Sequence, residues 1–111
     1  MLTAEPTVAT HDRLWAELWV SLASMLRSYT AAHGLNGKQQ ATVELGEEHI
    51  MVRSGERWMR LDRHEAQVDW ARENGSRGRM KLTMHGTLKN EAGGEEELDM
   101  QAEAWARELM Q

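Results

Sequence analysis

The residues with the widest capacity for chemistry in this sequence are its five histidines and eighteen acidic residues. His49, His85 and Asp69 are the best candidates for a metal site, since two imidazoles and one carboxylate are an established ligand set. The spacing does not strengthen this set, because the chain has no His-x-His or His-Glu-x-x-His motif and no cysteine. Histidines on a strand surface are the more common explanation. We therefore predict neither a metal nor another cofactor.

Acid–base and nucleophilic catalysis also lack a local signature. The sequence has no Gly-x-Ser-x-Gly motif, and its carboxylates show no pairing in an apolar stretch. The absence of cysteine removes thiolate nucleophiles, cysteine-ligated zinc and iron–sulfur centres. His33 follows a helical pattern and is better explained by the negative end of a helix dipole. These features favour a non-enzymatic protein.

Basic residues are concentrated in the middle of an acidic chain, whose net charge is −5. Segment 53–81 carries a net charge of +3, which leaves −8 for the remainder. Within it, the loop 74–79 combines Gly75 and Gly78 with two arginines, a composition able to bind phosphate oxygens. The negative total nevertheless opposes indiscriminate binding to nucleic acid. The basic residues of the segment are Arg53, Arg57, Arg60, Arg63, Arg72, Arg77, Arg79 and Lys81.

The first element expected to position these residues is an amphipathic helix. Its apolar side chains span an arc of about 140° on a helical wheel. Thr10 suits the N-cap, and His33 followed by Gly34 suits the end of the helix. We therefore predict a helix from Thr10 to His33, preceded by a flexible arm over residues 1–9. The apolar residues are Leu14, Trp15, Leu18, Trp19, Leu22, Met25, Leu26 and Tyr29.

After Gly37 the apolar spacing changes to the alternation that is typical of strands. Segments 41–45, 48–53 and 57–61 alternate clearly and are separated by turn sequences. Residues 62–72 allow two interpretations: a strand through Val68 and Trp70, which we favour, or a short helix. A longer strand over 79–85 follows, with Met80, Leu82 and Met84 on one face.

The chain ends in a second predicted helix, in which Glu95, Glu96 and Glu97 suit the positive first turn. We therefore predict an α+β fold, with a single domain over residues 10–111. It consists of a long N-terminal helix, an antiparallel meander of four or five strands, and a C-terminal helix (α-β4/5-α). Both helices are expected on one face of the sheet. The apolar residues of the last helix are Leu98, Ala102, Trp105, Ala106, Leu109 and Met110.

The face of the sheet away from the helices is the predicted interaction surface. Trp58 and Met51 would form an apolar patch there, which monomers tend to avoid, and Trp, Met and Arg are enriched in interface cores. We therefore predict a binding module that forms a homodimer through this face. The face that Trp58 occupies depends on the register, because a shift of one residue inverts a strand. The candidate surface comprises His49, Met51, Arg53, Trp58, Arg60, Arg77, Arg79, Lys81 and His85.

Two alternatives use other parts of the sequence. A nucleic-acid-binding domain would neutralise a single strand with residues 53–81 and stack its bases on Trp58. A small-ligand or enzyme pocket would lie between the sheet and the long helix, although core packing explains the same aromatic residues. No run reaches the roughly 18 apolar residues of a membrane helix, and no secretory signal is visible, so we expect a cytoplasmic protein without a membrane partner. The pocket residues would be Trp15, Trp19, Trp70 and Trp105.

Overall fold

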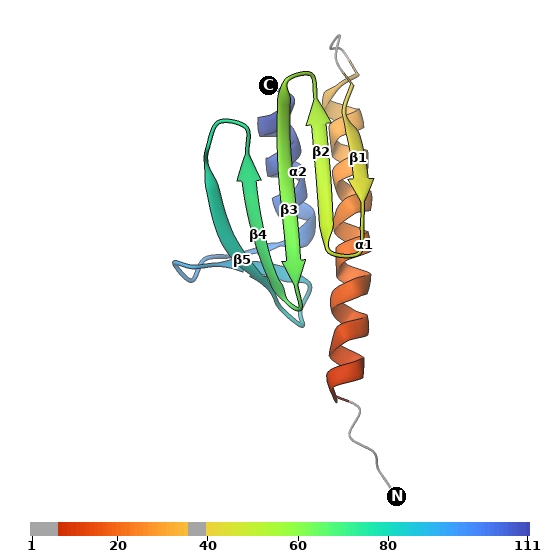
Figure 1. Cartoon of the computed structure of the whole chain (residues 1–111), viewed down its shortest axis with the longest axis vertical. Helices are drawn as coiled ribbons and strands as arrows, with labels where there is room; N and C mark the ends of the chain where they lie inside the picture. Colours follow the sequence, from red (N-terminus) through yellow and green to blue (C-terminus); the bar gives the residue numbers. More distant parts are fainter. Residues whose placement is uncertain (1–6, 36–39) are drawn as a thin grey trace, which may run out of the picture.

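The computed structural model describes residues 7–35 and 40–111, which form two helices and one seven-stranded antiparallel sheet (Figure 1). Each strand pairs with its neighbours in chain order, so the sheet is a meander between an N-terminal and a C-terminal helix. The predicted α+β class and the meander are therefore confirmed. The helices are α1 (Thr7–His33) and α2 (Leu98–Leu109), and the strands are β1 (Thr42–Leu45), β2 (His49–Ser54), β3 (Arg57–His64), β4 (Gln67–Arg72), β5 (Arg77–Leu82), β6 (Thr87–Asn90) and β7 (Glu95–Glu97).

Helix α1 ends where the sequence predicts and begins earlier. The Gly34 N–H donates to the carbonyl oxygen of Thr30 at 3.0 Å, which closes the helix after His33. At the other end the helix already includes Thr7, so Thr10 lies inside it and is not its N-cap. Residues 1–6 of the predicted arm lie outside the described residues.

The central strands follow the predicted alternation. Ile50, Val52, Met59 and Leu61 are almost fully buried, whereas Met51 is half-buried and Arg60 is exposed. Segment 67–72 is a strand that pairs with both β3 and β5, so the helical alternative for this region is wrong. Before it, Glu65 adopts a φ of 55°, and this turn conformation interrupts any helix between the two strands.

The sheet is larger than predicted, because β6 and β7 are too short to show an alternating pattern. Strand β5 ends at Leu82 and does not reach His85; Met84 lies in the following turn, where Gly86 has a φ of 78°. Glu95–Glu97 form β7 and do not open the last helix, which begins at Leu98. The predicted count of four or five strands and the predicted end of the 79–85 strand are therefore wrong.

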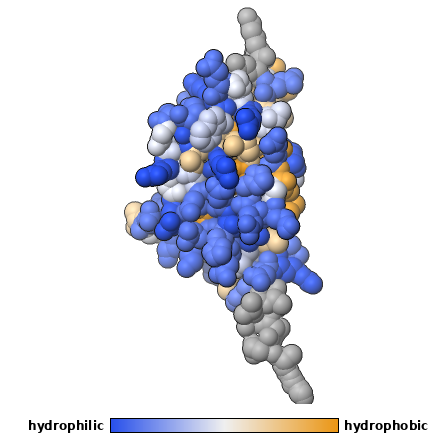
Figure 2. Space-filling view, in the orientation of Figure 1, coloured by the Kyte–Doolittle hydropathy of each residue, from blue (hydrophilic) through white to orange (hydrophobic). Residues whose placement is uncertain are grey.

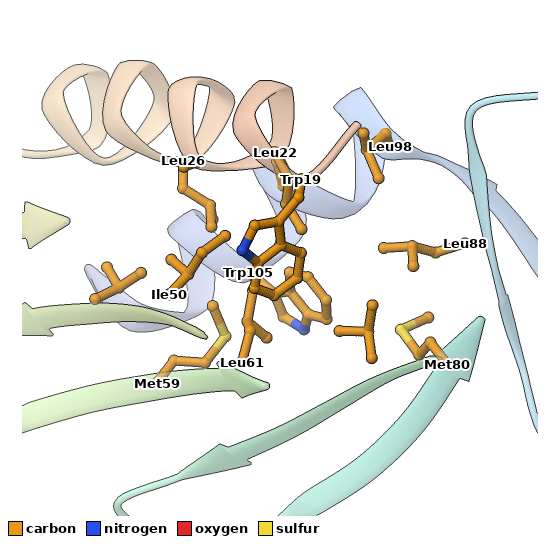
Figure 3. Packing of buried hydrophobic residues seen from close by; sticks show 14 of the residues in the cluster. Trp19, Leu22, Leu26, Ile50, Met59, Leu61, Met80, Leu88, Leu98 and Trp105 are labelled. Carbon is orange, nitrogen blue, oxygen red and sulfur yellow. The ribbon is translucent and has the colours of Figure 1, made fainter. Parts of the chain in front are cut away.

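Both helices lie behind the strands in Figure 1, and a single buried cluster joins them to the sheet. Trp19 and Trp105 point into the space between helices and strands, where only 2% and 5% of their surfaces are exposed (Figure 3). The helices run parallel to each other, as Tyr29 contacts Asp99 and His33 contacts Glu103. In the part of the chain that the structure describes, neither helix combines the length and apolar content needed to cross a membrane.

Candidate interaction surface

Within residues 7–35 and 40–111, no helix packs on one face of the sheet, and the cross-strand register defines the residues of this face. Each of them alternates with a side chain that points toward the helices. We call this surface the open face. Its residues are Thr42, Glu44, His49, Met51, Arg53, Trp58, Arg60, Asp62, His64, Gln67, Asp69, Ala71, Arg77, Arg79, Lys81 and Lys89.

Trp58 lies on the open face, directly across from Arg53, because the neighbouring Met59 is buried on the helix side. Met51 lies across from Arg60, and Ala71 follows on the next strand. All three apolar side chains are half-buried among longer charged neighbours. Figure 2 accordingly shows a mostly hydrophilic front face, with more apolar colour along the side formed by α1 and β1. The apolar patch is therefore smaller than the sequence suggests.

Ion pairs neutralise two of the predicted cations on the open face. Arg60 pairs with Asp62 at 3.0 Å, and Arg79 pairs with Asp69 at 2.9 Å. The two aspartates face each other across β3 and β4, and the flanking arginines offset the repulsion that such a pair creates. The hydrogen bond that Arg79 donates to Asp69, together with the negative charge of Asp69, raises the pKa of Arg79 above its ordinary value. Among the described residues, the open-face cations without an ion-pair partner include Arg53, Arg77 and Lys81.

Three other basic residues of the 53–81 segment point toward the helices and contact them. Arg57 donates to the main-chain oxygen of Glu108 at 3.2 Å, and Arg72 pairs with the side chain of Glu108 at 3.0 Å. Arg63 lies over the Trp19 ring at 5.8 Å from its centroid. The predicted basic patch is therefore split between the two faces of the sheet. The alternation could have revealed this, because Arg57 and Arg63 share their parity with buried Met59 and Leu61.

The two candidate histidines lie in different parts of the fold. His49 is on the open face opposite Asp62, whereas His85 lies in the turn between β5 and β6. The residues described contain no group of three or more His, Cys, Asp or Glu side chains that could hold a metal ion. The ligand set considered from the sequence is therefore not assembled.

The tryptophans assigned to a possible pocket are used mainly for packing. Trp19 and Trp105 belong to the buried cluster, and Trp15 and Trp70 pack against it. Trp70 and Trp105 also border a shallow surface hollow of about 460 Å³ beside Gly78. This hollow lies at the side of the sheet next to α2. At the predicted position between the sheet and α1, Trp19 borders another open hollow, of about 530 Å³, together with Leu45 and Arg63.

A further shallow hollow, of about 550 Å³, lies at β4 and β5 and is lined by three carboxylates. The predicted surface includes none of them, and only one, Asp69, was considered from the sequence, as a possible metal ligand. Asp62 was missed because the predicted strand ended at Leu61, whereas β3 continues for three more residues, to His64. Glu91 follows β6, which the sequence did not reveal. The carboxylates are Asp62, Asp69 and Glu91.

Comparison with known proteins assigns no relative, since no family model, curated protein or solved structure matches the chain.

Proposed function

We propose that this protein is a non-enzymatic interaction module that pairs with a second copy of itself through the open face. The observation that carries the proposal is a sheet with helices on one side and Trp58, Met51 and Ala71 on the other. Apolar side chains in the middle of a charged surface are typical of the core and rim of a protein interface.

The charges of the open face favour a protein partner over a nucleic acid. Asp62 and Asp69 lie near its centre and would repel phosphate groups, and they already neutralise Arg60 and Arg79. In a two-fold arrangement, however, a surface with both signs of charge can be complementary to itself. Unpaired cations of one copy would then approach the carboxylates of the other.

The size of the open face predicts a weak and reversible dimer. Strands β1 to β5, at a spacing of about 4.8 Å and a length of about 20 Å, offer an area of roughly 480 Å² per copy. The pair would bury about 1,000 Å² in total, which is slightly below the range of stable complexes, about 1,200–2,000 Å². We therefore expect a dissociation constant in the micromolar range or higher.

Sedimentation velocity over a series of protein concentrations tests this proposal. Met51→Lys places an additional charge in the middle of the open face and should weaken association at least tenfold, about 1.4 kcal/mol. Met84→Lys is the matched control, because Met84 is 62% exposed in the β5–β6 turn, away from the open face. A wild-type protein that stays monomeric at millimolar concentration would refute the proposal, as would equal effects of the two substitutions.

The nucleic-acid alternative makes a different prediction that the same samples can address. A labelled single strand should shift at low salt, and the shift should weaken when Arg77 and Arg79 are replaced by Ala. Our proposal predicts no such salt-dependent shift. Binding that depends on these two arginines would contradict it in favour of the nucleic-acid function.

A further inference from the structure

Strand β5 has an uncovered edge over its first half. In the described part of the chain, β6 pairs with Met80, Lys81 and Leu82 only, and the chain then turns away after Asn90. Residues 77–79 therefore have β4 on one side and no strand on the other, as the upper part of β5 in Figure 1 shows. We call residues 77–79 the β5 edge.

The main-chain groups of this edge point outward. The Leu82 N–H donates to Ala66 on the β4 side, whereas the Thr83 N–H donates to Thr87 on the β6 side. Because successive residues of a strand direct these groups to opposite sides, the N–H and C=O groups of Arg77 and Arg79 face away from β4. They make no main-chain hydrogen bond within the described residues. The edge thus offers two donors and two acceptors to an added strand.

The other edges of the sheet are protected. At β1, Arg27 donates to the carbonyl oxygen of Val43 at 3.4 Å. Strand β7 consists of Glu95, Glu96 and Glu97, and a row of like charges discourages strand pairing. At the β5 edge no side-chain hydrogen bond to the outward carbonyl groups is present among the described residues, and of its two arginines Arg79 is already paired with Asp69. With glycine at its centre, it is the edge most open to a partner strand.

The side chains around the β5 edge define what can bind there. On the helix side Gly78 has no side chain, and the Trp70 ring lies over it so closely that a Cβ atom there would be 2.6 Å from Trp70 Nε1. The hollow of about 460 Å³ beside Gly78, which Trp105 also borders, has room for an apolar side chain. On the open face Arg77 has no ion-pair partner among the described residues, whereas Arg79 is held by Asp69 and lies near Glu91.

A second copy of β5 is a poor partner for this edge. Two β5 edges that pair antiparallel around Gly78 would place Arg77 of each copy opposite Arg79 of the other. Like charges directly across a strand pair destabilise it. A partner with an acidic residue opposite Arg77 would instead form an opposite-charge pair.

We propose that the β5 edge is a docking site for an extended peptide segment of another protein, which adds one strand to the sheet. The segment carries an acidic residue opposite Arg77, an apolar residue opposite Gly78 and a polar, uncharged residue opposite Arg79. Antiparallel addition is favoured because its hydrogen bonds are the more stable. In that direction the segment reads polar, apolar, acidic.

A titration followed by NMR tests this site with the peptide acetyl-Ser-Thr-Ile-Glu-Ser-amide. Its binding should shift the amide signals of Arg77, Gly78 and Arg79 and the indole signals of Trp70 and Trp105. The amide protons of Arg77 and Arg79 should also exchange more slowly, since they gain acceptors. The same peptide with Lys in place of Glu should bind about tenfold more weakly.

Charge reversal on the protein provides the decisive comparison. Arg77→Glu should weaken binding of the peptide that contains Glu about tenfold, and the peptide with Lys in place of Glu should then bind more tightly. Arg53→Glu is the matched control, because Arg53 is an open-face cation on β2, three strands away, and should leave both affinities unchanged. Absence of shifts at the β5 edge, an unchanged preference in Arg77→Glu, or an equal effect of Arg53→Glu would each overturn the proposal.

The titration is repeated in Met51→Lys to separate it from self-association through the open face. Met51 lies on β2 and does not border the β5 edge, so peptide binding should persist in this variant. If Met51→Lys no longer dimerises but still binds the peptide, the docking site is independent of self-association. Loss of peptide binding in Met51→Lys would overturn the assignment to β5.

Discussion

Two arginines hold the C-terminal end of α2, and replacing each with methionine should have opposite effects on stability. Arg57 is exposed and donates to the main-chain oxygens of Glu108 at 3.2 Å and Leu109 at 3.4 Å. Arg72 has only 12% of its side chain exposed and pairs with the Glu108 carboxylate at 3.0 Å. Its Nε atom is buried and has no hydrogen-bond partner among the described residues.

Arg57→Met removes a cation from the negative end of a helix together with two hydrogen bonds. A cation at this position is worth about 0.3–1 kcal/mol, and the exposed hydrogen bonds add little more. We expect a loss of about 1 kcal/mol in the free energy of unfolding. Methionine keeps most of the apolar stem of arginine in place, so lost packing contributes little.

Arg72→Met loses an ion pair and also removes a buried polar group without a partner. The pair is worth about 0.5 kcal/mol, since 54% of the Glu108 side chain is exposed. Burying an unsatisfied N–H costs about 1–3 kcal/mol, which the substitution recovers. We therefore expect a gain of about 1 kcal/mol, and a difference of about 2 kcal/mol between the two variants.

Urea unfolding followed by far-ultraviolet circular dichroism measures both changes. The slope m of the urea transition should be the same in both variants. In thermal unfolding, the melting temperatures of the two variants should differ by about 8 °C, taking about 4 °C per kcal/mol for a chain of this size. If Arg72→Met proves less stable than Arg57→Met, the reasoning is refuted, because Arg72 would then be a net stabilising anchor of α2.

Two further predictions concern the core and the contact between the helices. Leu61→Ala should lower the free energy of unfolding by about 2–5 kcal/mol, whereas Leu45→Ala, at a side chain already 36% exposed, should cost far less; equal losses in urea unfolding would contradict the assigned core. The hydrogen bond from the Tyr29 hydroxyl to Asp99, at 2.5 Å, raises the pKa of Tyr29, the only tyrosine in the chain. Because the folded state holds this proton more tightly, the resulting stabilisation is complete below the ordinary tyrosine pKa of about 10 and is lost as the pH rises through the raised value. Absorbance titration should show a lower Tyr29 pKa in Asp99→Ala, and an unchanged pKa would refute the contact.

The features predicted from the sequence were those with many repeats of one period. The apolar stripe of α1 and the alternation of Ile50, Val52, Met59 and Leu61 repeat often enough to specify helix and strands. Strands β6 and β7 have four and three residues, and the Glu95–Glu97 run is equally compatible with a helix start. Only its pairing with the preceding strand β6 makes this run a strand, and three glutamates in a row carry no alternation of polar and apolar residues that would predict this pairing.

The sequence predicted many of the residues on the candidate surface, but only partly how they are arranged relative to one another. Alternation assigned Trp58, Arg60 and Arg79 to the open face, but it could not show which cations meet a carboxylate. Asp62 and Asp69 approach their arginines because β3 and β4 pair in one particular register. The β5 edge was not foreseen either, since it depends on β6 ending at Asn90, before it can cover Arg79.

Spin labels in a cysteine-free chain test self-association through the open face most directly. Since the chain contains no cysteine, a single introduced cysteine carries the only label. Thr42→Cys places it on the open face at the first strand of the sheet, across from Arg53, where it replaces an exposed residue and none of the three apolar ones; Met100→Cys places it on α2, where Met100 is 52% exposed. Double electron–electron resonance should give a defined intermolecular distance at position 42 and only background decay at position 100. Background decay at both positions, or a defined distance only at position 100, would contradict pairing through the open face.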